Sequence, residues 1–193
     1  MTDKVEKKEK RQVLISPEGF LMFPFLTHAC TSFDEKGVYK TDLVVAPSDM
    51  AVQKFLKGIQ EFLKKHMPKG GHVPYKKQVD EAGEETGNYV VSFKSQFKPG
   101  IFDVRNNEFP PEIIVGAGSK AKVAYVLNFY KGFGGGVNLY LQAVQIIDLV
   151  EYRGKSAESF GFTAEESQEA PEANPAEEAA NKKTDDGDGN LPF

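Results

Sequence analysis

The sequence predicts an all-β fold with one inserted helix, arranged as a small, curved antiparallel sheet or barrel. Two long segments, 120–131 and 137–151, alternate apolar and polar side chains and are joined by a glycine-rich turn, as in a hairpin of half-buried strands. Three further strand-like segments precede them, and one helical pattern separates the second from the third. We therefore expect about five strands and one helix.

The three earlier strands are expected at 20–30, 38–46 and 88–98. The first is dense in Phe and Leu but contains Pro24, which indicates a bulge or a break. The second alternates strictly, as in a half-buried strand. The apolar face predicted for the third comprises Tyr89, Val91, Phe93 and Phe97.

The helix is expected at 50–66, where apolar residues recur at spacings of three and four and make one buried face. Ser48 or Asp49 can cap its N-terminus. The segment 67–87 that follows is rich in Gly, Pro and charged residues, which predicts a long loop.

The chain of 193 residues suits one globular domain with extensions. Residues 1–155 carry 22 Lys and Arg against 18 Asp and Glu, a net charge of +4, whereas residues 156–193 carry 2 against 10, a net charge of −8. We therefore expect a charged N-terminal arm at 1–11, a mildly basic folded domain at 12–155 and a disordered acidic tail beyond it.

Little in this sequence supports a catalytic function. His28, His66 and His72 show no metal-binding spacing, and Cys30 lies two residues from His28 on one predicted strand, which does not place a nucleophile beside a base. The glycines of 132–136 lack the Lys-Ser/Thr ending of a phosphate-binding loop and join two strands. The sequence predicts a protein that is not an enzyme and needs no metal or cofactor.

The expected location of the protein is the cytoplasm. The N-terminal residues contain no long apolar segment of the kind found in a secretory signal, and no apolar run approaches the roughly 18 residues of a membrane span. A single cysteine also suits a reducing compartment. No membrane partner is expected.

The outward faces of the predicted strands favour binding of a single-stranded nucleic acid. Such proteins hold phosphates with cations and stack bases on aromatic rings, at about 1–3 kcal/mol per base whatever the sequence. The candidate phosphate contacts are Lys40, Lys94, Lys98, Lys120, Lys122 and Lys131. The candidate stacking residues are Tyr130, Phe133 and Tyr140. The plain alternative is that these lysines are merely solvated and that the two tyrosines only cover the sheet.

The C-terminal end offers a second candidate site. An acidic tail that only aids solubility has no need of the final Leu191-Pro192-Phe193. A terminal Phe with its free carboxylate suits an apolar pocket ringed by Lys or Arg, and acidic residues can mimic phosphates in the basic groove of the chain's own domain. The residues expected to engage partners are Asp185, Asp186, Asp188 and Phe193.

Two segments and the tail resemble the single-stranded DNA-binding proteins that short-tailed bacteriophages encode for their own replication. The first segment is Gly37-Val38-Tyr39-Lys40-Thr41-Asp42-Leu43. The second, 113–151, contains Ser119-Lys120-Ala121-Lys122-Val123 after a glycine turn and closes with Leu149-Val150-Glu151. The family often has Trp near the hairpin, where this chain has Lys131-Gly132-Phe133. The acidic ending in Pro192-Phe193 is also similar to the tip of bacterial single-stranded DNA-binding proteins.

This resemblance implies an OB-fold, a five-stranded Greek-key barrel, with a helix inserted between strands. It implies binding of single-stranded DNA without base specificity, in phage DNA replication, recombination and repair, together with annealing of complementary strands. It also implies that the tail recruits the phage DNA polymerase and helicase-primase and competes with DNA for the groove. A homodimer formed through swapped tails or a strand edge is consistent with the same family.

Two other functions fit the same residues. One is an OB-fold adaptor whose main ligand is a protein, with the tail as its working end; a strong salt dependence of DNA binding argues against it. The other is an RNA chaperone, because the sequence shows no device for sensing a 2′-hydroxyl group. Competition between matched RNA and DNA oligonucleotides separates this function from DNA binding.

Overall fold

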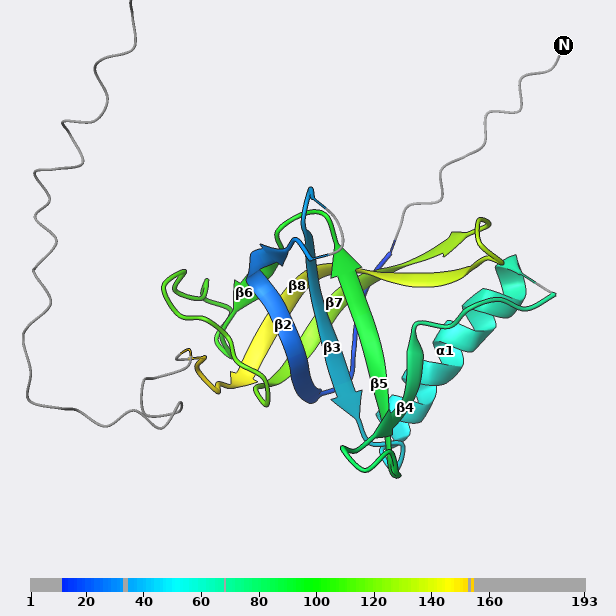
Figure 1. The fold of residues 1–193 in the computed structure, drawn as a ribbon, viewed down its shortest axis with the longest axis horizontal. Coiled ribbons are helices and arrows are strands. Elements are labelled where there is room, and N and C mark those ends of the chain that lie inside the picture. The colour runs from blue at the N-terminus through cyan, green and yellow to red at the C-terminus, as the bar shows by residue number, and fades with distance from the viewer. Residues whose placement is uncertain (1–11, 33–34, 68, 153, 155–193) are drawn as a thin grey trace, which may run out of the picture. The chain divides into compact units, whose positions relative to one another are not determined.

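The computed structural model describes residues 12–32, 35–67, 69–152 and 154. This part of the chain contains one helix and eight strands, which confirms the all-β prediction with a single inserted helix (Figure 1). The helix α1 spans Met50–His66 and lies between β3 and β4 in sequence. The strands are β1 (Val13–Ile15), β2 (Gly19–Cys30), β3 (Val38–Val45), β4 (Tyr75–Val79), β5 (Glu85–Ser95), β6 (Gly100–Phe102), β7 (Lys120–Tyr130) and β8 (Gly136–Asp148).

Five of these strands pair into a closed ring. The antiparallel pairs are β7–β2, β2–β3, β3–β5 and β8–β7, and the parallel pair β5–β8 completes the circuit. Three shorter strands extend it, with β1 pairing β7, β6 pairing β8 and β4 pairing β5. The predicted OB-fold is therefore confirmed, with three strands added to the five that were expected.

The helix α1 begins where the sequence predicts. Of the two candidate caps, Asp49 is the one used, because its carboxylate accepts the N–H of Ala51 at 2.7 Å. Lys64, Lys65 and His66 in the last turn suit the negative end of the helix dipole. Within the described residues, no helix has the length and apolar character needed to cross a membrane. The buried face of α1 comprises Val52, Phe55, Leu56, Ile59 and Leu63.

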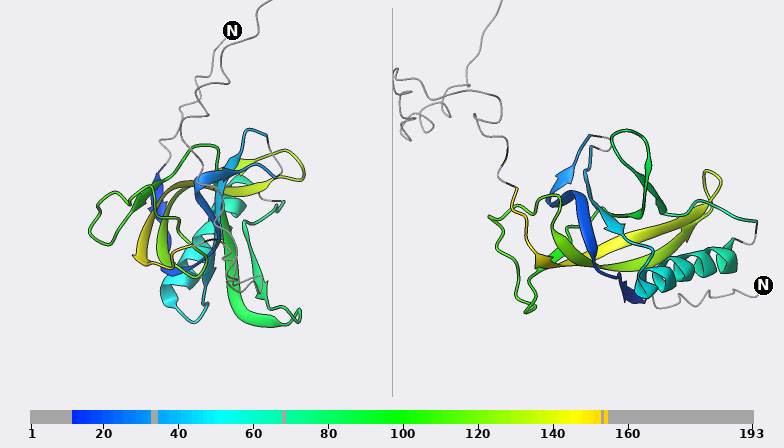
Figure 2. Two further views of the ribbon diagram at one scale, coloured as in Figure 1. Left: turned by 60° about the vertical axis from the view of Figure 1, so that its left-hand side comes forward. Right: turned by 90° about the horizontal axis from the view of Figure 1, so that it is seen from below.

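The hairpin of β7 and β8 projects from the ring and meets the C-terminal end of α1 (Figure 2). The ring of His66 stacks on Phe129, with centroids 4.6 Å apart and planes inclined by 11°. Beside this contact, the His72 N–H donates to Gly135 and the His72 carbonyl accepts from Val137, both at 2.9 Å. A Cβ on Gly136 would lie 2.6 Å from the His72 carbonyl oxygen, so this close approach requires glycine.

The expectation of a long loop at 67–87 is wrong in part, because β4 lies within it and β5 begins at Glu85. Asp80 forms the turn between them, since its carboxylate accepts the N–H groups of Ala82 and Glu84 at 2.9 Å. Gly83 completes the turn with a φ of 86°. The strand was missed because β4 is largely exposed and carries polar residues, so it lacks a clear apolar alternation.

The third predicted strand ends earlier than expected. β5 stops at Ser95, whose hydroxyl accepts the N–H of Phe97 at 3.0 Å and turns the chain. Phe97 is consequently 82% exposed, and its assignment to the apolar face is wrong. Pro99 follows two residues later and has no N–H to continue the ladder, which is a physical reason for the early end.

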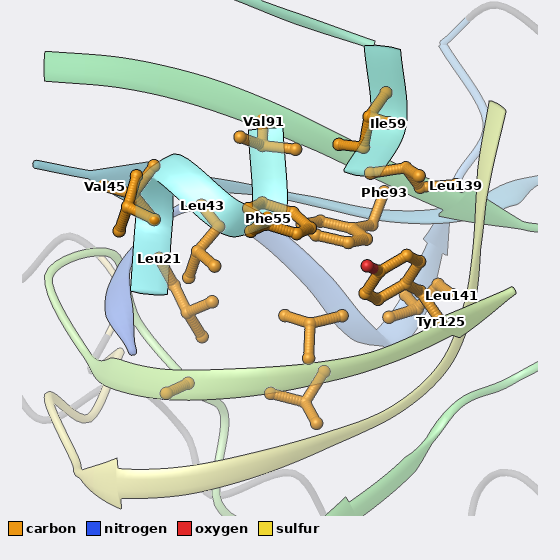
Figure 3. Close-up of a cluster of buried hydrophobic side chains, with 14 of the residues drawn as sticks. Leu21, Leu43, Val45, Phe55, Ile59, Val91, Phe93, Tyr125, Leu139 and Leu141 are labelled. Carbon is orange, nitrogen blue, oxygen red and sulfur yellow. The ribbon is translucent and has the colours of Figure 1, made fainter. Parts of the chain in front are cut away.

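The core fills the interior of the ring and the space beneath α1 (Figure 3). Phe93 of β5 and Phe55 of α1 both pack edge-to-face on Tyr125 of β7, with ring centroids 5.5 Å and 5.7 Å away. Tyr125 thereby joins the helix to β7 and β7 to β5. Other fully buried members are Leu21, Leu43, Val45, Ile59, Val91, Leu139 and Leu141.

Burial raises the pKa of Tyr125 to about 12 and predicts an alkaline loss of stability. An unfolded tyrosine ionises near pH 10. The stability that the folded protein gains by keeping the Tyr125 hydroxyl protonated is therefore fully present below pH 10 and is lost between about pH 10 and 12. A difference of this size between the folded and unfolded pKa corresponds to roughly 2–3 kcal/mol of stability. Urea unfolding at about pH 9 and about pH 11.5 should show a smaller alkaline loss in Tyr125→Phe than in the wild type. Tyr152→Phe, at an exposed site, is the control and should leave the loss unchanged.

Candidate nucleic-acid interface

Three of the predicted contact residues lie side by side on the outer face of the ring. Lys40 of β3 pairs in register with Lys94 of β5, and Lys94 pairs in register with Tyr140 of β8. Alternation sends the neighbouring Phe93 and Leu139 into the core, so the lysines and the tyrosine face outward. Strands lie about 4.8 Å apart, so the row spans roughly 10 Å. We call these three residues the Lys40–Tyr140 row.

A groove with a volume of about 520 Å³ is lined by Lys94 and Tyr140 of this row, and Lys40 lies beside it on the neighbouring strand. Asn138 and Gln142 flank Tyr140 on the same face of β8 and bring amide groups that both donate and accept hydrogen bonds. The exposed ring of Phe97 stands beside them. The full lining comprises Val38, Lys94, Ser95, Gln96, Phe97, Asn138, Tyr140 and Gln142.

Phe25 of β2 extends the Lys40–Tyr140 row by one strand and was missed by the sequence reasoning. It pairs in register with Lys40, whose ammonium group lies 5.2 Å from the centre of the Phe25 ring. The ring is 38% exposed. The signal that could have found it is Pro24, because a proline inside a strand indicates a bulge that changes which side chains face outward.

The lysines predicted on β7 lie elsewhere on the ring and have an acidic partner. Glu18 accepts from Lys120 at 2.9 Å and from Lys122 at 3.2 Å. These hydrogen bonds hold the pKa of Glu18 below its ordinary value, and Glu18 in turn raises the pKa of Lys120. Lys120 also pairs in register with Asp148 of β8. The structure therefore does not bring these two lysines into the Lys40–Tyr140 row, and their positive charge is partly neutralised.

The remaining predicted contacts do not line the groove. Tyr130 ends β7 on the same face of the hairpin as Tyr140, four register pairs further along it. Lys131 and the fully exposed Phe133 follow at the hairpin tip, where Phe133 has a φ of 51°. Lys98 is exposed just beyond the end of β5. The tail residues Asp185, Asp186, Asp188 and Phe193 lie outside the described residues.

Cys30 lies at the end of β2, next to Ser32, and is largely buried. No group of three or more His, Cys, Asp and Glu side chains there could hold a metal ion. The Cys30 sulfur lies 3.6 Å from the Ser32 hydroxyl, and hydrogen bonds with Ser32, followed by the charge of Lys40, lower the pKa of the thiol. The cysteine is 8% exposed and packs at the end of β2.

The same fold occurs in solved structures of phage proteins. The crystal structure of gp2.5, a single-stranded DNA-binding protein encoded by bacteriophage T7, is similar to 83% of this chain and 99% of its own, with 20% identity and a TM-score of 0.60. The chain has the fold of a phage single-stranded DNA-binding protein. The resemblance drawn from the sequence is thus confirmed for the fold.

Two structures of the single-stranded DNA-binding protein from bacteriophage Enc34 are also similar. The one in complex with single-stranded DNA matches 74% of this chain and 89% of its own, with 19% identity and a TM-score of 0.59. The C-terminally truncated form matches 70% and 85%, with 17% identity and a TM-score of 0.60. No family model and no curated protein matches the sequence. At such low identities the likeness defines the fold, and the function is argued from the groove.

Proposed function

We propose that the protein binds single-stranded DNA, without base specificity, in the groove over β3, β5 and β8. The observation that carries this proposal is the Lys40–Tyr140 row, in which strand register places two cations and one ring next to each other. Ammonium groups neutralise phosphates, and a tyrosine ring stacks on any base. The fold shared with phage single-stranded DNA-binding proteins, one of them in complex with single-stranded DNA, supports the same function.

The absence of base specificity follows from the chemistry of the groove. A π-face is common to all four bases, so stacking on Tyr140 does not select among them. The amides of Asn138 and Gln142 can reverse donor and acceptor roles by rotation, and they therefore suit different base edges. Binding of this kind breaks no covalent bond, so we assign the protein no enzymatic role and no cofactor.

The wider role that we propose is in phage DNA replication, recombination and repair. In this proposal, residues 12–155 form the DNA-binding domain, residues 1–11 form an arm and residues 156–193 form the tail. Asp185, Asp186, Asp188 and Phe193 would recruit the phage DNA polymerase and helicase-primase, and a homodimer is part of the same proposal. The support is the charge of the tail, with 10 acidic residues against 2 basic ones, and its apolar end.

The decisive experiment is fluorescence anisotropy of a labelled oligothymidylate titrated with the full chain at two salt concentrations, with duplex DNA and matched RNA as competitors. We expect preference for the single strand over the duplex and weaker binding at higher salt. Tyr140→Ala should lose roughly 5- to 150-fold in affinity, the equivalent of one stacked base, and Tyr140→Phe should retain it.

The other outcomes of this titration have clear meanings. No binding at low salt overturns the proposal and favours a protein adaptor that works through its tail. Displacement by RNA as readily as by DNA assigns the groove to RNA as well. An unchanged affinity in Tyr140→Ala would remove the stacking role from this residue.

Asp42 should weaken binding to this groove. It faces outward on β3, two residues from Lys40, and pairs in register with Ser92 of β5. That spacing is about 7 Å along a strand, close enough for its charge to repel a phosphate held by Lys40. Asp42→Asn should raise the affinity for single-stranded DNA a few-fold at low salt, and the gain should fade at high salt. Asp148→Asn, beside Lys120, is the matched control and should change affinity less.

A further inference from the structure

The strand β2 is interrupted in its middle, and the interruption presents two aromatic rings to solvent. Its register with β3 shifts between Met22 and Phe25 and again between Phe25 and Cys30. Phe23 has a φ of 48°, and Pro24 contributes no N–H to the ladder. The Phe23 ring is 62% exposed and the Phe25 ring 38%. An exposed pair of phenylalanines on a bulged strand has no role in packing the core.

These rings form one side of a pocket of about 380 Å³, within the usual range for small-ligand sites. Its walls are mostly apolar, and the ring of Tyr152, which is 56% exposed, stands among them. At the rim, the Thr27 hydroxyl and the His28 Nδ1 atom lie 2.9 Å apart and offer polar groups. The pocket therefore combines flat aromatic faces with a few hydrogen-bonding atoms, which is the chemistry that suits a nucleobase.

The opposite wall is held in place by the backbone. The Tyr152 N–H donates to the Ile114 carbonyl at 2.8 Å, and the Gly116 N–H donates to the Val150 carbonyl at 2.7 Å. The Ser119 hydroxyl donates to the carbonyls of Gly116 and Val150 and is fully buried. The segment that carries Tyr152 is thus fixed to the turn opposite β2, so the pocket is a preformed feature of the described structure.

The pocket lies one strand beyond the Lys40–Tyr140 row on the outer face of the ring. Phe25 lines the pocket and also pairs in register with Lys40, which belongs to the Lys40–Tyr140 row. From Tyr140 to Phe25 the outer face crosses three strand spacings, roughly 14 Å. A single strand lying across β8, β5 and β3 would therefore reach β2, and Lys40 would hold a phosphate at the junction.

We propose that this pocket receives a base of the same single strand, stacked against Phe23, Phe25 and Tyr152, so that the binding surface continues from β8 to β2. This inference rests on the proposed function, since it extends the path of that strand. It adds a second stacking site, formed by residues distant from the groove in sequence. The chain's own Leu191-Pro192-Phe193 is the competing occupant, and the experiment distinguishes it from DNA.

The test compares the full-length wild type and variants with oligothymidylates of about 4 and about 12 nucleotides, within the 4–16 nucleotides that one OB-fold covers. The wild type should gain affinity with length as the strand reaches the pocket. Phe23→Ala should remove about 5- to 150-fold of the affinity for the longer oligonucleotide, and Phe23→Tyr should restore it. The matched control is Phe20→Ala, because Phe20 is also an exposed phenylalanine of β2 and does not line the pocket.

A direct readout is photocrosslinking of an oligonucleotide that carries 5-iododeoxyuridine, followed by peptide mass spectrometry. We expect crosslinks to Phe23, Phe25 or Tyr152. Normal binding of both oligonucleotides by Phe23→Ala, with no crosslink at these residues, overturns this inference and leaves the groove intact. Tighter binding by Phe23→Ala also overturns it and assigns the pocket to the tail. Failure of the wild type to bind either oligonucleotide would instead overturn the proposed function.

Discussion

Replacing Lys40 and Lys94 together by alanine is expected to weaken binding of single-stranded DNA at least tenfold at low salt. Each phosphate contact on a single strand contributes about 0.7 to the slope of the logarithm of affinity against the logarithm of salt concentration, so the slope should fall by roughly 1.4. The effect should be large because the two lysines are register partners, so that together they can contact neighbouring phosphates of one strand. Titrations at several salt concentrations measure both quantities.

The matched control is the double variant Lys120→Ala and Lys122→Ala. It removes the same charge from the same protein, but from a strand where Glu18 already neutralises part of that charge. We expect a clearly smaller loss of affinity and little change in slope. Equal losses in the two double variants would show that DNA contacts β7 as much as β3 and β5, which would contradict the assignment of the groove. Thermal unfolding of both variants should accompany the titrations, because Lys40 also packs over Phe25.

The contrast between these two lysine pairs shows how much of the candidate site could be predicted from the sequence. Alternation along β3, β5 and β7 predicts Lys40, Lys94, Lys120 and Lys122 on outer faces, and their neighbours Thr41, Phe93, Ala121 and Val123 are buried. Alternation does not reveal which strands are neighbours. The parallel pairing of β5 with β8 joins segments more than forty residues apart, and it is this pairing that brings Lys94 beside Tyr140.

The long strands and the helix were predicted more accurately than the short exposed strands and the bulges, and the reason is physical. Long strands and the amphipathic helix carry repeated apolar positions, so β7, β8 and α1 could be placed closely from the pattern. Short exposed strands such as β4 carry little burial signal. Bulges also escape the pattern, because one extra residue reverses the faces that follow it. Phe25 was missed for this reason.

The partner of Lys120 and Lys122 could not be predicted either. Glu18 precedes β2, about one hundred residues before β7 in the chain, and the two meet because β2 and β7 are paired in the ring. From the sequence alone, these lysines count as cations that are available to bind phosphates. The three-dimensional pairing shows that Glu18 offsets part of their charge, which is the physical basis for ranking them below Lys94.

Phe93→Ala is expected to have the largest effect on stability, a loss of about 3–5 kcal/mol in the free energy of unfolding. Phe93 is 1% exposed and packs edge-to-face on Tyr125, so truncation leaves a cavity where the helix meets the ring. Urea denaturation measures the loss. At a temperature where the variant is folded, its affinity for single-stranded DNA should be close to that of the wild type, because the neighbouring Lys94 faces the groove and Phe93 does not.

Phe97→Ala is the matched control and should give the opposite result. Phe97 shares the alternating pattern of Phe93 in sequence but lies beyond the end of β5, exposed at the side of the groove. Its removal should change the free energy of unfolding by less than about 0.5 kcal/mol. If its ring stacks on a base, the same variant should lose at least about fivefold in DNA affinity. A large loss of stability in Phe97→Ala would contradict the early end of β5, and a loss of DNA affinity in folded Phe93→Ala would show that the groove depends on the core beneath it.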